Sequence, residues 1–116
     1  MYIGEWDNGL RSGSGIYQFS DGDSYNGQWI NDLYSGSGAY THSNGQQRYV
    51  GDYVDGKRHG KGSFCWSTGE KYVGDFVNDQ LEGHGTLTMP NGSSYNGEFK
   101  NGKRHGRGEL RVVQQS

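Results

Sequence analysis

The sequence repeats one pattern five times at an almost constant interval. Each copy reads Tyr-x-Gly-x-aromatic, followed by about seven turn residues and then Gly-x-Gly. The copies start 23 or 24 residues apart, at Tyr2, Tyr25, Tyr49, Tyr72 and Tyr95. A fixed period of this length is the signature of a repeat architecture, in which each unit packs against its neighbours. We therefore treat the chain as a single array with repeats at residues 1–24, 25–48, 49–71, 72–94 and 95–116.

Glycines and aromatic residues keep fixed places in this repeat. If each tyrosine is position 1, all 22 glycines fall on positions 3, 8, 12, 14 and 21. Fifteen of the 16 aromatic residues fall on positions 1, 5, 16 and 18. These residues alternate within positions 1–5 and within positions 12–18, which is the period of a β-strand. The pattern predicts an all-β chain of β-hairpins, with strands near positions 1–6 and 12–18 and a turn near positions 7–11.

The alternation also predicts one buried aromatic face. Rings at positions 1 and 5 are expected to lie across the glycine backbones at positions 3, 12 and 14, because a glycine within a strand often marks a close approach. The other face carries polar or small residues, so it is expected to be wetter. The predicted core consists of the rings at positions 1 and 5, which are Tyr2, Trp6, Tyr25, Trp29, Tyr49, Tyr53, Tyr72, Phe76, Tyr95 and Phe99.

The composition agrees with a thin array better than with a thick globule. Only 29% of the residues are hydrophobic and the mean hydropathy is -1.01, whereas the aromatic content of 14% argues against disorder. A net charge of -2 provides no general attraction to nucleic acid. The single cysteine, Cys65, excludes an intrachain disulfide and fits a reducing compartment, so we expect a cytoplasmic protein. Because the chain starts directly at the repeat, we expect a fragment of a longer array.

Two stretches carry a family resemblance. Lys57-Arg58-His59-Gly60-Lys61-Gly62 and the matching stretch from Lys103 to Gly108, together with the 23-residue period, resemble the MORN (membrane occupation and recognition nexus) repeat. The resemblance covers essentially the whole chain, although Ser12, Ser35 and Glu82 replace the motif histidine in three copies.

The resemblance implies an elongated, single-layer antiparallel sheet of five stacked β-hairpins. It also implies a scaffold. Members of this family associate with membranes or phosphoinositides, bind partner helices in a groove, form dimers, or are attached to enzymes.

Basic residues gather in repeats three and five. They could form a patch for phosphate groups or an acidic partner, or they could simply keep the turns soluble. Counted by repeat, the net charges are -3, 0, +1, -3 and +3, so the array has an acidic N-terminal end and a basic C-terminal end. The candidate residues are Lys57, Arg58, His59, Lys61, Lys103, Arg104, His105 and Arg107.

Other candidate sites are weaker. Tyr34 is the one aromatic residue outside the frame, and we expect either a contact site or local packing beside a turn. His59, His84 and His105 lack the short spacing of metal ligands, and Cys65 has no helix N-terminus to activate it. The sequence therefore predicts no metal, no cofactor, no catalytic residues and no enzymatic activity.

These observations leave three functional hypotheses. The first is a non-enzymatic scaffold in a cytoskeletal or membrane-apposed assembly. It would bind a protein partner, such as a helix or peptide in a groove, and it would self-associate, since open sheet edges and aromatic faces attract other chains. The second is a module that binds anionic phospholipid through its basic residues. The third is a regulatory array belonging to a larger enzyme.

Overall fold

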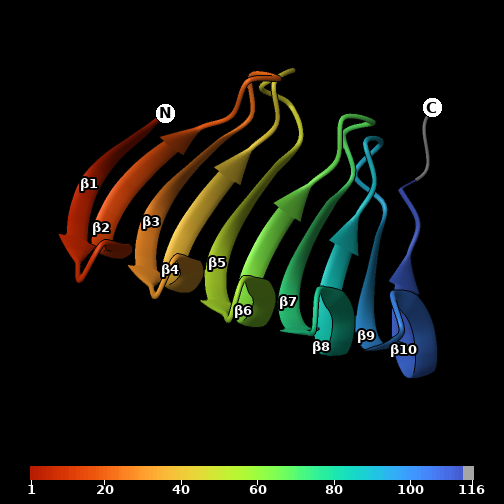
Figure 1. Ribbon diagram of the computed structural model, residues 1–116. Coiled ribbons are helices and arrows are strands. Elements are labelled where there is room, and N and C mark those ends of the chain that lie inside the picture. The colour runs from red at the N-terminus through yellow and green to blue at the C-terminus, as the bar shows by residue number, and fades with distance from the viewer. Residues whose placement is uncertain (114–116) are drawn as a thin grey trace.

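The fold is one antiparallel sheet of ten strands that follow one another in chain order (Figure 1). The structure is a computed structural model and describes residues 1–113. It measures 57 × 27 × 16 Å, so the sheet is elongated and forms a single layer, as expected. Its strands are β1 (Tyr2–Asp7), β2 (Leu10–Gln18), β3 (Ser24–Ile30), β4 (Leu33–Thr41), β5 (Arg48–Val54), β6 (Lys57–Cys65), β7 (Lys71–Val77), β8 (Gln80–Thr88), β9 (Ser94–Lys100) and β10 (Lys103–Arg111).

Each repeat is a hairpin closed by a two-residue turn. The residue at position 7 has φ of 48–53° and the residue at position 8 has φ of 70–83°. Two consecutive positive φ angles are characteristic of a type I′ turn, whose twist matches that of paired strands. The turn occupies positions 7 and 8 only, so the predicted turn at positions 7–11 was too long. Consequently Lys57, Arg58 and His59 lie on β6, and Lys103, Arg104 and His105 lie on β10.

A β-bulge explains the glycine at position 12. In every hairpin the register shifts between positions 3 and 5 of the first strand, and the glycine at position 12 has φ of 66–103°. The side chain at position 4 accepts a hydrogen bond from the backbone N–H at position 13, as Glu98 does from Arg107 at 2.7 Å. A Cβ at position 12 would meet that side chain rather than a ring. The expectation that a ring covers this glycine was therefore wrong.

The glycines at positions 3 and 14 lie beneath the tyrosine of their own repeat. The Tyr49 hydroxyl donates a hydrogen bond to the carbonyl oxygen of Asp52 at 2.8 Å, and this places the ring across the backbone. A Cβ on Gly51 would lie 2.5 Å from Cα of Gly62 and 2.7 Å from the Tyr49 hydroxyl. These contacts leave no room for a side chain, and the same arrangement recurs in all five repeats.

The core is a zigzag of aromatic rings. Each position 1 tyrosine contacts the position 5 ring of its own repeat, and in repeats one to four it also contacts that of the next repeat. All these ring centroids are 5.0–5.4 Å apart and the rings meet edge to face. The buried residues of this core are Tyr25, Trp29, Tyr49, Tyr53, Phe64, Tyr72, Phe76, Tyr95 and Phe99.

Trp6 departs from the expected core. Its side chain is 59% exposed, whereas the equivalent Trp29 is 2% exposed. Trp29 lies between the rings of Tyr2 and Tyr25, but within residues 1–113 Trp6 meets only the ring of Tyr2. The burial of a position 5 ring therefore depends on the tyrosine of the preceding repeat.

The longer connections between repeats follow the edge of the sheet opposite the type I′ turns (Figure 1). In each one two backbone hydrogen bonds close a turn. In the first connection the Phe19 N–H, at position 18, donates to the Asp23 carbonyl oxygen, and the Gly22 N–H, at position 21, donates to the Phe19 carbonyl oxygen. The one extra residue of repeat two lies in such a connection, where the Asn44 side chain accepts hydrogen bonds from Gln46 N–H and Gln47 N–H. Residues 114–116, which end the predicted fifth repeat, lie outside the described residues.

The face opposite the aromatic core is less polar than expected. Nine aliphatic side chains on it are 38–66% exposed. The prediction of a wetter face rested on positions 4 and 17, but positions 2, 6, 9 and 15 point the same way and are often apolar. We call this surface the aliphatic face, and its exposed members are Ile3, Leu10, Ile16, Ile30, Leu33, Val50, Val54, Val73 and Val77.

Candidate functional site

The aromatic face of the sheet is hollowed along its length. One hollow of about 350 Å³ is lined by Arg11, Trp29 and Tyr34, among others. The next, of about 340 Å³, shares Tyr34 and Gly56 with it. A third, of about 470 Å³, lies between repeats three and five. Because the first two share walls, they lie side by side, and we call the surface with all three hollows the aromatic groove.

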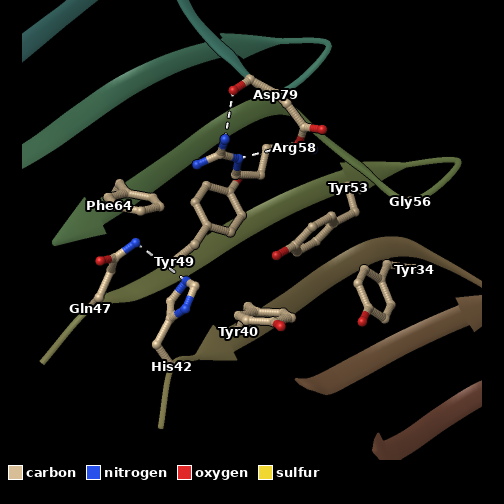
Figure 2. A pocket seen from close by; sticks show the side chains of 10 residues that line it. All are labelled: Tyr34, Tyr40, His42, Gln47, Tyr49, Tyr53, Gly56, Arg58, Phe64 and Asp79. Carbon is tan, nitrogen blue, oxygen red and sulfur yellow. Dashed lines mark hydrogen bonds and ion pairs between the residues drawn. The ribbon is translucent and has the colours of Figure 1, made fainter. Parts of the chain in front are cut away.

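The middle hollow draws its walls from three strands, β4, β5 and β6, and from three connections (Figure 2). Tyr53 and Tyr34 lie on one side, and Phe64 and Arg58 lie on the other. The sequence spacing explains this convergence, because the groove-facing positions 5, 10 and 16 recur in neighbouring strands. The lining residues are Tyr34, Tyr40, His42, Gln47, Tyr49, Tyr53, Gly56, Arg58, Phe64 and Asp79.

Arg58 packs against rings of the aromatic core and is held in place by Asp79 of the next repeat. Its guanidinium carbon is 5.8, 5.1 and 5.4 Å from the ring centroids of Tyr49, Phe64 and Phe76. Its Nη2 donates to the Asp79 carbonyl oxygen at 2.7 Å, and its backbone N–H donates to Asp79 Oδ1 at 2.8 Å. This arginine combines cation–π contacts with charge-assisted hydrogen bonds. It therefore joins repeat three to repeat four.

Arg11 of repeat one makes contacts equivalent to those of Arg58, and it joins repeat one to repeat two. It lies over the rings of Tyr2, Tyr17 and Trp29 and pairs with Asp32 Oδ1 at 2.9 Å. The Arg11 backbone N–H, and then its guanidinium, hold the pKa of Asp32 below its usual value. Asp32 has a φ of 70°, an uncommon angle for aspartate. Its bonds to Arg11 give a physical reason for an aspartate at this turn position.

Position 10 therefore alternates along the groove. It is arginine in repeats one, three and five, but Tyr34 in repeat two and Leu81 in repeat four. Position 8 alternates with it, because it is aspartate only in repeats two and four. The groove thus presents a guanidinium and an apolar side chain in turn.

Tyr34 is a wall of the groove. Its ring stacks on Tyr25 with centroids 3.9 Å apart and an interplanar angle of 13°, and it meets the edges of Trp29 and Tyr53. It is also partly exposed to the two hollows that it separates. Burial raises the pKa of the Tyr34 hydroxyl to about 12, so the side chain stays neutral.

The comparison with protein families bears directly on this architecture. The MORN repeat model matches the chain five times, at residues 2–24, 25–47, 49–71, 72–94 and 95–111. The chain belongs to the MORN repeat family. MORN repeats are generally modules for interaction with proteins or membranes, and the repeat itself is non-enzymatic. A comparison with curated protein sequences found no match.

The basic residues of this MORN array do not form one patch. In repeat three, Arg58 is held by Asp79 and Lys61 pairs with Asp75. In repeat five, the four candidates Lys103, Arg104, His105 and Arg107 are exposed, and no ion pair involves Lys103, Arg104 or Arg107 within residues 1–113. Three strands separate β6 from β10, and alternate residues on each strand point to opposite faces.

One polar cluster of the MORN array was not foreseen from the sequence. The Tyr40 hydroxyl donates to Asp23 Oδ2 at 2.7 Å, and Ser43 N–H donates to Asp23 Oδ1 at 2.9 Å. The Tyr40 hydrogen bond is the main reason that the pKa of Asp23 is lowered. His42 Nδ1 lies 3.6 Å from the same carboxylate, and its Nε2 lies 3.4 Å from the Gln47 amide. Asp23 lies on one connection, whereas its partners lie at the end of β4 and on the next connection, so only knowledge of how the repeats stack would have revealed the cluster.

Within the part of the chain that the structure describes, no group of three or more His, Cys, Asp or Glu side chains could hold a metal ion. No helix among residues 1–113 is long and apolar enough to cross a membrane.

Proposed function

We propose that this MORN array is a non-enzymatic interaction module that binds a segment of a protein partner along its aromatic groove. The observation that carries the proposal is the row of three hollows, two of which share walls, lined by aromatic rings and by Arg11, Arg58 and Arg104. Concave, mostly apolar surfaces with a few fixed polar groups are typical of binding sites. The assembly in which such a module would act is cytoskeletal or membrane-apposed.

The groove defines the chemistry of the partner. Interior strands below the groove pair with neighbours on both sides, so a partner there would be bound by its side chains rather than as an added strand. Equivalent walls recur once per repeat, which is about 9.6 Å for two strand spacings. Two turns of α-helix cover about 10.8 Å. The expected partner is therefore a helix that presents apolar side chains about seven residues apart, and an extended peptide with apolar residues at every third position is the alternative.

Selection from peptide libraries tests this proposal. One phage-displayed library on a helical scaffold and one of unstructured peptides would be selected against the chain. Binders should lose at least about tenfold in affinity when Tyr34 is changed to Glu. Tyr34→Leu should bind almost normally, since Leu81 occupies the equivalent place in repeat four. The proposal fails if no binders emerge, or if Tyr34→Glu, shown by circular dichroism to be folded, binds them unchanged.

A second candidate function is binding of anionic phospholipid, and the exposed basic residues of repeat five favour it. Vesicle flotation with and without phosphoinositide would test it. Replacing Lys103, Arg104 and Arg107 with Gln should abolish flotation, whereas Lys57→Gln with Lys61→Gln should not, because Lys61 is already paired with Asp75. Equal flotation of both variants, or none with the unmodified chain, would contradict this function.

A further inference from the structure

The aliphatic face carries an almost uncharged row across the whole sheet. In register, each residue of this row stands opposite the next one on the adjacent strand. The row has a single charged member, at its last strand. Its residues are Ile3, Ile16, Asn26, Ala39, Val50, Ser63, Val73, Thr86, Asn96 and Glu109. Five of the ten are apolar, and four of these, Ile3, Ile16, Val50 and Val73, are exposed. Exposed apolar side chains gathered on one face commonly mark an interaction site.

A second row on the same face has a charge gradient. It lies beside the type I′ turns and begins with an acid, Asp7, which pairs in register with Leu10. Its middle contains apolar residues such as Ile30 and Val54. It ends with two bases, Lys100 and Lys103, which pair with each other in register. The two end repeats differ in the same sense, since repeat one has four acids and one base (net -3) and repeat five has five bases and two acids (net +3), although repeat four is also acidic (net -3).

We propose that two copies of this chain pack aliphatic face to aliphatic face, around a two-fold axis parallel to the strands that passes between β5 and β6. This axis places repeat one of each copy over repeat five of the other, so Asp7 comes close to Lys100 and Lys103. A two-fold axis along the length of the sheet would instead superpose acidic repeats on acidic repeats. Opposite charges across an interface select its orientation.

The dimensions suit such an interface. A face of 57 × 27 Å has more area than the ~800 Å² per partner that a standard interface buries. Packed sheets lie about 10 Å apart and interdigitate their side chains, for which exposed valine and isoleucine are well suited. The aromatic grooves of both copies would remain open on the outside. The inference therefore goes beyond the proposed function and does not depend on it.

Analytical ultracentrifugation tests the dimer. Val50 lies on β5, beside the proposed axis, so Val50→Asp would bring two carboxylates together and should weaken dimerisation by at least about tenfold. The side chain is 45% exposed, and the variant should stay folded. The control is Val112→Asp, which makes the same change at a 64% exposed residue beyond the last strand and should leave the dimer intact. A chain that stays monomeric at about 100 µM, or a Val50→Asp variant that dimerises normally, would overturn the proposal.

A charge swap tests the orientation. Asp7→Lys should weaken the dimer, and the same chain with Lys100→Asp and Lys103→Asp added should recover it, because the two-fold axis brings the altered sites together. Cys65, the only cysteine, lies on β6 near the axis, and its copies would be within roughly 10 Å of each other. A short bis-maleimide should therefore join two chains. Failure of the swap to restore the dimer, or absence of the cross-link, would contradict this arrangement.

Discussion

At the scale of single residues, each repeat depends on a tyrosine that lies across two glycines. Tyr49 covers Gly51 and Gly62, and its hydroxyl is anchored to the carbonyl oxygen of Asp52. Burial raises the pKa of the Tyr49 hydroxyl to about 12, so this hydrogen-bond donor persists at any physiological pH. The repeated glycines are thus required by close packing, and the Tyr-x-Gly-x-aromatic motif mainly builds the sheet.

Gly51→Ala should destabilise the fold by about 2–3 kcal/mol, since its Cβ would overlap the backbone of Gly62. Urea unfolding followed by circular dichroism would measure this loss. Gly9→Asn is the control, because a Cβ there meets nothing within 4 Å and asparagine tolerates the φ of 79°. Equal losses in the two variants would contradict the packing argument.

The lowered pKa values of three aspartates predict loss of stability in acid. Hydrogen bonds from Arg11, Tyr40 and Lys61 lower the pKa values of Asp32, Asp23 and Asp75, respectively. Because the folded pKa values lie below the unfolded value of about 3.9, this stabilisation is complete above about pH 5 and is lost as the pH falls through the folded values.

Asp32→Asn should therefore lower the free energy of unfolding at pH 7 but have much less effect near pH 2. Urea unfolding at both values would measure the difference. Asp21→Asn is a suitable control, since Asp21 accepts only a local hydrogen bond from the backbone of Asp23. A loss in Asp32→Asn that is the same at both pH values would show that the charge of Asp32 is not involved.

At the scale of hairpins, the edge-to-face rings couple each repeat to the next. Trp29→Ala should cost about 3–5 kcal/mol, because it removes a buried ring that joins repeats one and two. Trp6→Ala should cost much less, since its side chain is 59% exposed. Denaturant unfolding of both variants would compare them, and similar losses would contradict the zigzag of rings.

Much of the hairpin could be predicted from the sequence. The period-two alternation of Tyr49, Gly51 and Tyr53 specifies a strand and the face that it buries. The turn was predicted too long because the strand pattern resumes at Arg58, whose contact with the core depends on an aspartate in the next repeat. The alternation of residues within one repeat does not show which residues of the next repeat lie beside it. The alternating charge and apolar character of position 10 was the available signal for the groove.

The aliphatic face was missed for a different reason. Val50 and Val73 occupy positions that are polar in other repeats, as in Asn26 and Asn96. The five copies are therefore similar on the aromatic side and variable on the other. Residues common to all copies reveal how the repeat folds, whereas the residues that vary indicate where one array differs from another.

At the scale of the whole molecule, the array should behave as a nearly one-dimensional system. Each strand pairs only with its sequence neighbours, so one repeat can be removed without exposing a shared centre. A chain that ends at residue 94 should fold, and its urea m-value should fall by roughly one fifth. Unfolding of the truncated chain into a structureless state under native conditions would contradict this behaviour.

The central claim is that the aromatic groove binds the partner. A titration of the ¹⁵N-labelled chain with a peptide selected from the libraries, followed by amide chemical shifts, tests it most directly. The largest shifts should fall on groove-facing residues of β4–β6, including Tyr34, Arg58 and Phe64. Shifts concentrated on Val50, Val73 and the rest of the aliphatic face, with the groove residues unmoved, would contradict it.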